Sequence, residues 1–148
     1  MRRIALGLVF LLVACKAAPP PAPAPQAIQP EGIDYPAIKA HKLYGNGCNF
    51  VAEGGGLAAL VLAQEKEAIL KLAGKIVRIP ADTSSQLLSD FARTRYADAS
   101  HILILAPIPG GTAVVNGQVQ NVPVRLAIVD AAGRPEFTAK GLVQCKSM

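Results

Sequence analysis

The chain has no tryptophan, few acidic residues and only two histidines, which leaves little material for several kinds of catalytic or metal site. No Cys-x-x-Cys or His-x-x-x-His spacing occurs, so the common zinc-site patterns are missing. No Gly-x-Ser-x-Gly or Ser-x-x-Lys motif is present, and no Walker lysine follows the glycines between 45 and 56. We therefore expect no cofactor, no metal and no catalytic residues, and a hydrolase is the less favoured alternative.

Long hydrophobic runs are also scarce, since only one occurs, at the beginning of the chain. Ile4–Val13 follows two arginines and precedes Ala14 and Cys15. Ten residues span about 15 Å as a helix, roughly half the hydrocarbon core of a bilayer. The run therefore predicts a secretory signal peptide over residues 1–14, and a resident membrane helix is the alternative.

The residues Leu12-Val13-Ala14-Cys15 resemble the lipobox of bacterial lipoproteins. The resemblance implies lipid attachment to Cys15 and cleavage before it, and several acyl chains would anchor the protein stably to a membrane. Lys16 stands where an aspartate would retain an enterobacterial lipoprotein in the inner membrane. We therefore expect a lipid-anchored protein of the cell envelope, held on the outer membrane and facing the periplasm. The alternative for Cys15 is an ordinary cysteine in an uncleaved signal.

A proline- and alanine-rich segment follows the cysteine. Pro19–Pro25 is uncharged and favours an extended polyproline conformation, so residues 15–42 are predicted to be a lipidated tether. A ligand for another protein's domain is the alternative for the proline run. Residues 43–148 are predicted to form a single small domain. Removal of residues 1–14 lowers the net charge from +5 to +3, an ordinary balance that predicts no nucleic-acid partner.

Short strand-forming runs separated by glycine and asparagine organise the domain. They predict a mostly β fold, a small antiparallel β-sandwich or barrel. The composition of residues 57–73 favours a helix, but their polar positions leave no polar face, so we expect two strands joined by residues 64–67. Asn116-Gly117 predicts a type I′ hairpin turn. One short helix is expected near 83–92, with a cap at residues 82–84.

Two cysteines remain once Cys15 is assigned to the lipid. Cys48 and Cys145 lie near the two ends of the predicted domain, and export would place them in an oxidising compartment. We predict that they form a disulfide joining the first strand to the last, whose chain-entropy contribution is up to about 4.7 kcal/mol. A metal site and a reactive thiol are the alternatives.

The stretch Arg93-Thr94-Arg95-Tyr96 is the one local cluster that suggests a partner surface. Its two cations and its aromatic ring supply charge and flat contact area, so Arg93, Arg95 and Tyr96 are candidate partner-binding residues. The alternative is a strand whose alternate residues face solvent.

The order of Cys48, a hairpin-like segment at 68–79 and Arg95-Tyr96 is similar to that in the periplasmic and membrane-bound inhibitors of c-type lysozyme. In that family a Ser-Gly-x-Arg-Tyr loop reaches the active site of the enzyme, whereas this chain has Ala92 and Arg93 in place of serine and glycine. The resemblance implies inhibition of a cell-wall hydrolase as an alternative. The leading expectation is a non-catalytic binding or structural domain whose partner is an envelope protein, a cell-wall polymer or a small ligand.

Overall fold

The computed structural model describes residues 27–146 and is mostly β, as the sequence predicts. The lipobox, Cys15 and the proline run lie outside the described residues. The helix and the strands are, in chain order, β1 (Pro30–Glu31), α1 (Tyr35–His41), β2 (Gly47–Ala52), β3 (Val61–Gln64), β4 (Glu67–Leu72), β5 (Lys75–Pro80), β6 (Leu87–Ser89), β7 (Ala92–Arg93), β8 (Arg95–Ala97), β9 (His101–Pro107), β10 (Val114–Asn116), β11 (Val119–Asp130) and β12 (Pro135–Lys146).

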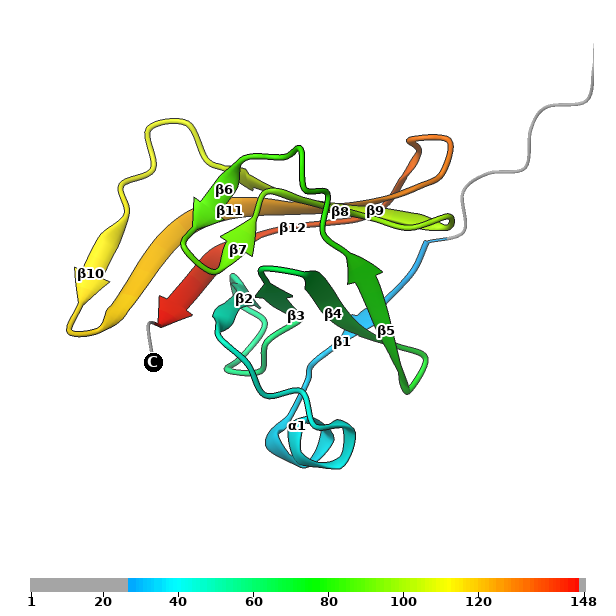
Figure 1. Ribbon diagram of the computed structural model, residues 1–148. Helices are drawn as coiled ribbons and strands as arrows, with labels where there is room; N and C mark the ends of the chain where they lie inside the picture. Colours follow the sequence, from blue (N-terminus) through cyan, green and yellow to red (C-terminus); the bar gives the residue numbers. More distant parts are fainter. Residues whose placement is uncertain (1–26, 147–148) are drawn as a thin grey trace, which may run out of the picture.

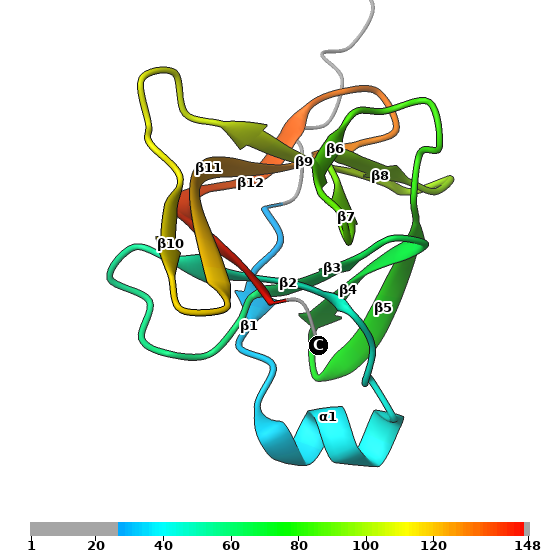
Figure 2. The same ribbon diagram turned by 60° about the vertical axis from the view of Figure 1, so that its left-hand side comes forward.

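A single antiparallel sheet curls into a barrel-like shape (Figures 1 and 2). From one end to the other its strands run β5-β4-β3-β2-β12-β11-β9-β8, with β10 added beside β11 and β1 beside β4. The two end strands meet at one point, because Ala81, next to β5, forms an antiparallel bridge with Tyr96 in β8. The β6–β7 hairpin is a separate two-stranded sheet.

Alternating side chains from the strands fill the inside of the curled sheet. Phe50 and Tyr96 are the largest of these and are fully buried. Period-two alternation sends every second residue of a strand to one face, which is why the short hydrophobic runs could be recognised as strands. The remaining buried members of this core are Cys48, Val61, Ala63, Ala68, Leu70, Ile79, Ala92, Leu103, Leu105, Val124, Leu126, Ile128, Val143 and Cys145.

The ambiguous segment 57–73 forms two strands, as its pattern predicts. β3 and β4 pair in antiparallel register, with Ala63 opposite Ala68, and a short turn joins them. Helix propensity is overruled because Leu70 and Ala68 face the main core while Ile69 faces the opposite side of the sheet, where it is also buried. A strand with both faces covered needs no polar face.

The helix expected near 83–92 is absent, and that prediction is wrong. The capping signal is real, since Asp82 Oδ1 accepts hydrogen bonds from the backbone N–H and the hydroxyl of Ser84. It closes only a turn, however, because the Gln86 carbonyl accepts from the N–H of Thr94 instead of from a following helical turn. The chain then forms the β6–β7 hairpin, which places Ala92 in the core.

The domain also begins earlier than the predicted boundary at Leu43. β1 pairs with β4, and Ile33 is 3% exposed. Asp34 caps α1 through a 2.9 Å bond from Ala37 N to its Oδ1, and proline is compatible with the first turn of this helix. Ile38 of α1 then packs on the outer face of β3 and β4. Residues 30–42 therefore belong to the fold, and the predicted tether is too long.

The Asn-Gly hairpin forms with a different turn from the one predicted. Asn116 pairs with Val119, so the two central residues are Gly117 and Gln118. Gly117 has φ 62°, whereas Asn116 and Gln118 are not among the described residues with positive φ. Positive φ at the first central residue alone is the type II′ pattern, which suits a hairpin as well as type I′ does. The hairpin was predicted correctly and its turn type was not.

Candidate functional site

Tyr96, one of the three predicted partner-binding residues, is not available to a partner. Its side chain is fully buried in the core. The hydroxyl donates to the Gln64 carbonyl at 2.8 Å and accepts from the Arg93 backbone N–H at 2.8 Å. Burial raises the pKa of this phenol, so it stays neutral. The Arg-Tyr pair that resembles the lysozyme inhibitors thus lies in strand β8 with its ring inside the barrel.

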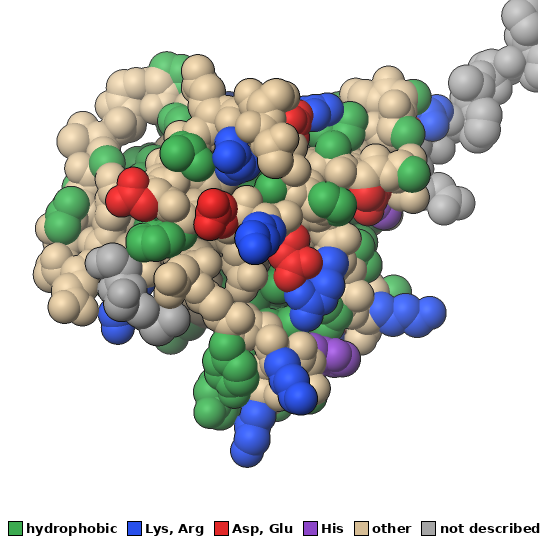
Figure 3. Space-filling view, in the orientation of Figure 1, with side chains coloured by type: hydrophobic (Ala, Val, Ile, Leu, Met, Phe, Trp, Pro, Cys, Tyr) green, Lys and Arg blue, Asp and Glu red, His purple; other side chains and the backbone are tan. Residues whose placement is uncertain are grey.

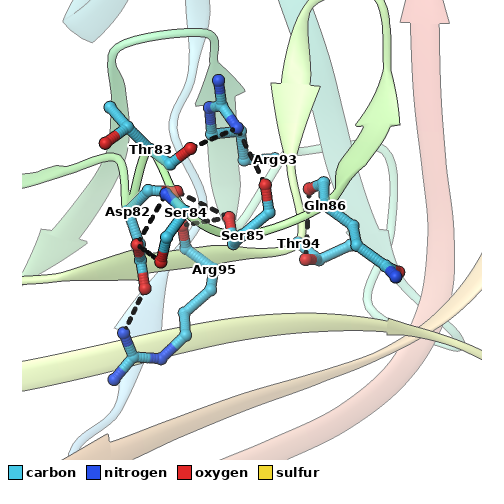
Figure 4. Close-up of polar contacts among 8 residues, drawn as sticks. All are labelled: Asp82, Thr83, Ser84, Ser85, Gln86, Arg93, Thr94 and Arg95. Carbon is cyan, nitrogen blue, oxygen red and sulfur yellow. Dashed lines mark hydrogen bonds and ion pairs between the residues drawn. The ribbon is translucent and has the colours of Figure 1, made fainter.

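Arg93 and Arg95 are used mainly to hold the loop before β6 (Figure 4). Arg93 Nη1 donates to the carbonyl of Ser85 at 2.8 Å and to that of Thr83 at 3.2 Å. Arg95 forms an ion pair with Asp82, and the hydrogen bond from Ser84 together with Arg95 lowers the pKa of Asp82 to about 2. The two arginines of the predicted cluster therefore bind a loop of their own domain. The surface around them carries intermixed charges of both signs (Figure 3).

The predicted disulfide is present. Cys48 in β2 and Cys145 in β12 are directly opposite each other in the strand register, with their sulfur atoms 2.11 Å apart. The Ser89 hydroxyl of the β6–β7 hairpin donates to Cys48 Sγ at 3.1 Å, since a disulfide sulfur carries no hydrogen. The disulfide thus joins β2 to β12, the last strand, and contacts the β6–β7 hairpin.

A groove of about 400 Å³ lies on the outer face of β2, β12 and β11. Helix α1 packs on the outer face of β3 and β4 and does not line this groove. Ile108, from the loop after β9, forms one wall. The remaining lining residues are Val51, Ala52, Glu53, Pro123, Lys140, Gly141, Leu142 and Gln144. We call this hollow the outer-face groove.

The strand register arranges the outer-face groove in two parallel rows. Pro123, Leu142 and Val51 stand opposite one another on three neighbouring strands and form an apolar row. Two residues further along, Arg125 stands directly opposite Lys140. These two cations also border a second hollow of about 370 Å³, which shares Lys140 with the groove. The sheet therefore presents an apolar strip beside a basic one.

The groove lining combines apolar side chains with few ionisable ones. Its ionisable side chains are Glu53 and Lys140, and the lining contains no histidine, cysteine or serine. A nucleophile with an adjacent general base, the usual signature of covalent catalysis, therefore has no counterpart in this lining. The groove can offer apolar contact, charge–charge attraction and hydrogen bonds from Gln144.

A second cluster of titratable groups joins two hairpins at another place in the fold. His101 Nδ1 lies 3.9 Å from Asp98 Oδ1, and its Nε2 lies 3.9 Å from Glu136 Oε2. Asp98 also accepts hydrogen bonds from the backbone N–H groups of Ser100 and His101, which fixes the β8–β9 turn. Over residues 27–146, no group of three or more His, Cys, Asp or Glu side chains is suited to hold a metal ion. The cluster thus brings the β8–β9 turn and the start of β12 together.

The groove was not predicted from the sequence because its residues come from four separate segments of the chain. The alternation of β12 does place Lys140, Leu142 and Gln144 on one face, and that signal was readable. The partner strands that complete the two rows follow from the register, which a single sequence does not specify.

Comparison of the chain with protein-family models, with curated proteins and with solved structures finds no match. In the part of the chain that the structure describes, no helix has the length and hydrophobicity needed to cross a membrane.

Proposed function

We propose that this chain is a lipid-anchored envelope protein whose β domain is a non-catalytic binding module. Cys15 carries the lipid in this proposal, and the protein faces the periplasm from the outer membrane. The lipobox and Lys16 support the address, and the proline-rich segment supplies the distance between membrane and domain.

The outer-face groove is the observation that carries the binding role. Side chains fill the interior of the barrel, and the largest of these side chains are fully buried. The groove therefore lies outside the packed core. Leu142 remains 41% exposed in the floor of the groove. Covering the apolar surface of a leucine side chain with other apolar atoms lowers the free energy. A ligand on the outer-face groove would supply that contact.

Site-specific photo-cross-linking in the native envelope tests this binding role. A photoreactive amino acid replaces Leu142 in the full-length chain, and the same amino acid at Leu87, which is 57% exposed on the β6–β7 hairpin, serves as the control. We expect a discrete adduct from position 142 that position 87 does not give. Identical adducts at both positions, or none at position 142, would contradict the binding role.

The membrane address is tested separately by Cys15→Ser. The wild-type chain is expected to fractionate with the outer membrane and to carry a mass increase from acyl groups on Cys15, the first residue of the mature chain. The variant is expected to lose both. Unchanged fractionation of the variant would show that another feature retains the protein.

A further inference from the structure

We propose that the outer-face groove binds a single-chain amphiphile with an anionic head, either a carboxylate or a phosphate. The head lies over Arg125 and Lys140, and the apolar chain lies along Pro123, Leu142 and Val51. This inference rests on the proposed function, because it names the ligand class of that groove.

The charge arrangement is the first reason. Arg125 and Lys140 are directly opposite on β11 and β12, so their Cβ atoms are about 5 Å apart, and like charges at such a position destabilise a sheet. Among the described residues, neither forms an ion pair with an acidic side chain. Four other cations of the domain do form such ion pairs, namely Lys71 with Glu31, Arg78 with Glu67, Arg95 with Asp82 and Arg134 with Asp130. An anionic group between Arg125 and Lys140 would relieve their repulsion.

The hollow around the two cations has the right chemistry for the head group. Its lining consists of Arg125, Thr138, Ala139 and Lys140, with no acidic side chain. Thr138 supplies a hydroxyl donor, and the two cations supply charge-assisted hydrogen bonds. The groove's own carboxylate, Glu53, is next to Lys140 on the side away from Arg125, where its N–H donates to the Lys140 carbonyl. Repulsion from Glu53 therefore favours a head group on the Arg125 side.

The apolar row lies where the chain of such a ligand would run. Along each strand it is two residues from the cationic pair, a distance of about 7 Å. Pro123 and Leu142 form the floor together with Val51, and Ile108 stands beside them as a wall. Head and chain can thus be recognised at the same time by one continuous surface.

Titration calorimetry with dodecanoate, below its micellar concentration, tests the proposal. The protein is the mature chain, residues 15–148, with Cys15→Ser so that no detergent is needed. We expect saturable binding of dodecanoate and of dodecyl phosphate, and at least ten-fold weaker binding of dodecyltrimethylammonium, which has the same chain and a cationic head. Equal affinity for the anionic and cationic ligands would overturn the proposal, and this comparison needs no variant.

The residue assignment is tested by Arg125→Gln and Lys140→Gln, each expected to weaken dodecanoate binding at least ten-fold. Arg125→Lys keeps the charge and is expected to stay within about three-fold of wild type. Lys75→Gln, at an exposed residue at the start of β5, is the matched charge control. Binding that is unchanged in both glutamine variants would overturn the assignment. So would binding to vesicles rich in anionic phospholipid without binding of monomeric dodecanoate, because the groove would then contact a membrane surface.

Failure of this inference is distinguishable from failure of the proposed function. A discrete cross-link at position 142 with no dodecanoate binding would leave the groove as a binding site for a ligand of another class. Absence of both the cross-link and the binding would overturn the two proposals together.

Discussion

At the scale of single residues, Tyr96 joins the barrel core to the loop that covers it. Its hydroxyl is the partner of the Gln64 carbonyl and of the Arg93 N–H, both of which lie near the core. Tyr96→Phe removes that partner while keeping the ring, so we expect a loss of about 1–3 kcal/mol in the free energy of unfolding. Urea denaturation measures it. Tyr44→Phe is the control, since Tyr44 is 61% exposed, and equal midpoints for the two variants would contradict the expected role.

Asp82 makes the stability of the domain sensitive to acid. Its folded-state pKa of about 2 lies below the ordinary value of 3.8, so the folded state favours the ionised form. The stabilisation is complete above about pH 4 and is lost as the pH falls from 4 towards 2. We expect Asp82→Asn to lower the thermal midpoint at pH 7 and to flatten its decline below pH 4. The measurement is a set of thermal melts between pH 2 and 7, and Asp90→Asn is the control for removing one carboxylate. If the thermal midpoint of Asp82→Asn falls with pH as steeply as that of the wild type, Asp82 is not the source of the acid sensitivity.

At the scale of the elements, β12 depends on Gly141 where it pairs with β2. A Cβ at Gly141 would lie 2.1 Å from the Val51 carbonyl oxygen and 2.9 Å from Phe50 Cζ, so the strands could not keep their spacing. We expect Gly141→Ala to destabilise the fold by roughly 1–3 kcal/mol through overpacking. Gln144→Ala, on the outer face of the same strand, is expected to change stability by less than about 0.5 kcal/mol. A similar effect of the two substitutions on the urea midpoint would contradict the expected steric role of Gly141.

The disulfide is a second property of the paired elements. It closes a loop of 97 residues in sequence separation, so its removal enlarges the unfolded ensemble considerably. We expect the double variant Cys48→Ala and Cys145→Ala to lose about 2–5 kcal/mol relative to the oxidised protein. Equilibrium unfolding in urea without reductant checks this, and an unchanged midpoint would mean that the strand ladder alone determines the stability.

Part of the fold was predictable at this scale because strand alternation is local. β3, β4 and the hairpin at Asn116 could be recognised from their own residues, and Cys48 with Cys145 could be paired because only two cysteines remained. The segment after Asp82 could not, since its cap and its leucines suit one turn of helix or one hairpin equally well. Only the buried Tyr96 and the cross-strand bond from Thr94 to Gln86 decide between them.

The candidate site was less predictable for the same physical reason. Arg125 and Lys140 become neighbours through the register of β11 against β12, and Val51 joins Leu142 through that of β12 against β2. A single sequence shows which face a residue takes but not which residue stands opposite. Burial of Tyr96 is likewise invisible locally, because Arg-x-Arg-Tyr with its ring inside or outside has the same sequence.

At the scale of the whole molecule, the segment before Leu43 covers the outer face of β3 and β4. A chain that begins at Ala27 keeps every described contact, whereas one that begins at Leu43 loses Ile33 and α1 and uncovers Leu62 and Ile69. We expect the first to unfold at the same urea concentration as the full mature chain and the second to unfold at a clearly lower one. Equal midpoints for the two truncated chains would show that the domain does begin at Leu43.

The disulfide and the position of β1 also determine how the molecule would respond to a pulling force at its N-terminal side. The force would reach the two-residue pairing of β1 with β4 first, then the bridge of Ile33 to Ala59 and the short helix α1. At Cys48 it would meet a covalent bond to β12, and the barrel behind that bond would not open by the same route. Residues 27–46, about twenty residues, could therefore extend by roughly 70 Å before the force reaches β2 and its disulfide, while the barrel and its groove stay intact.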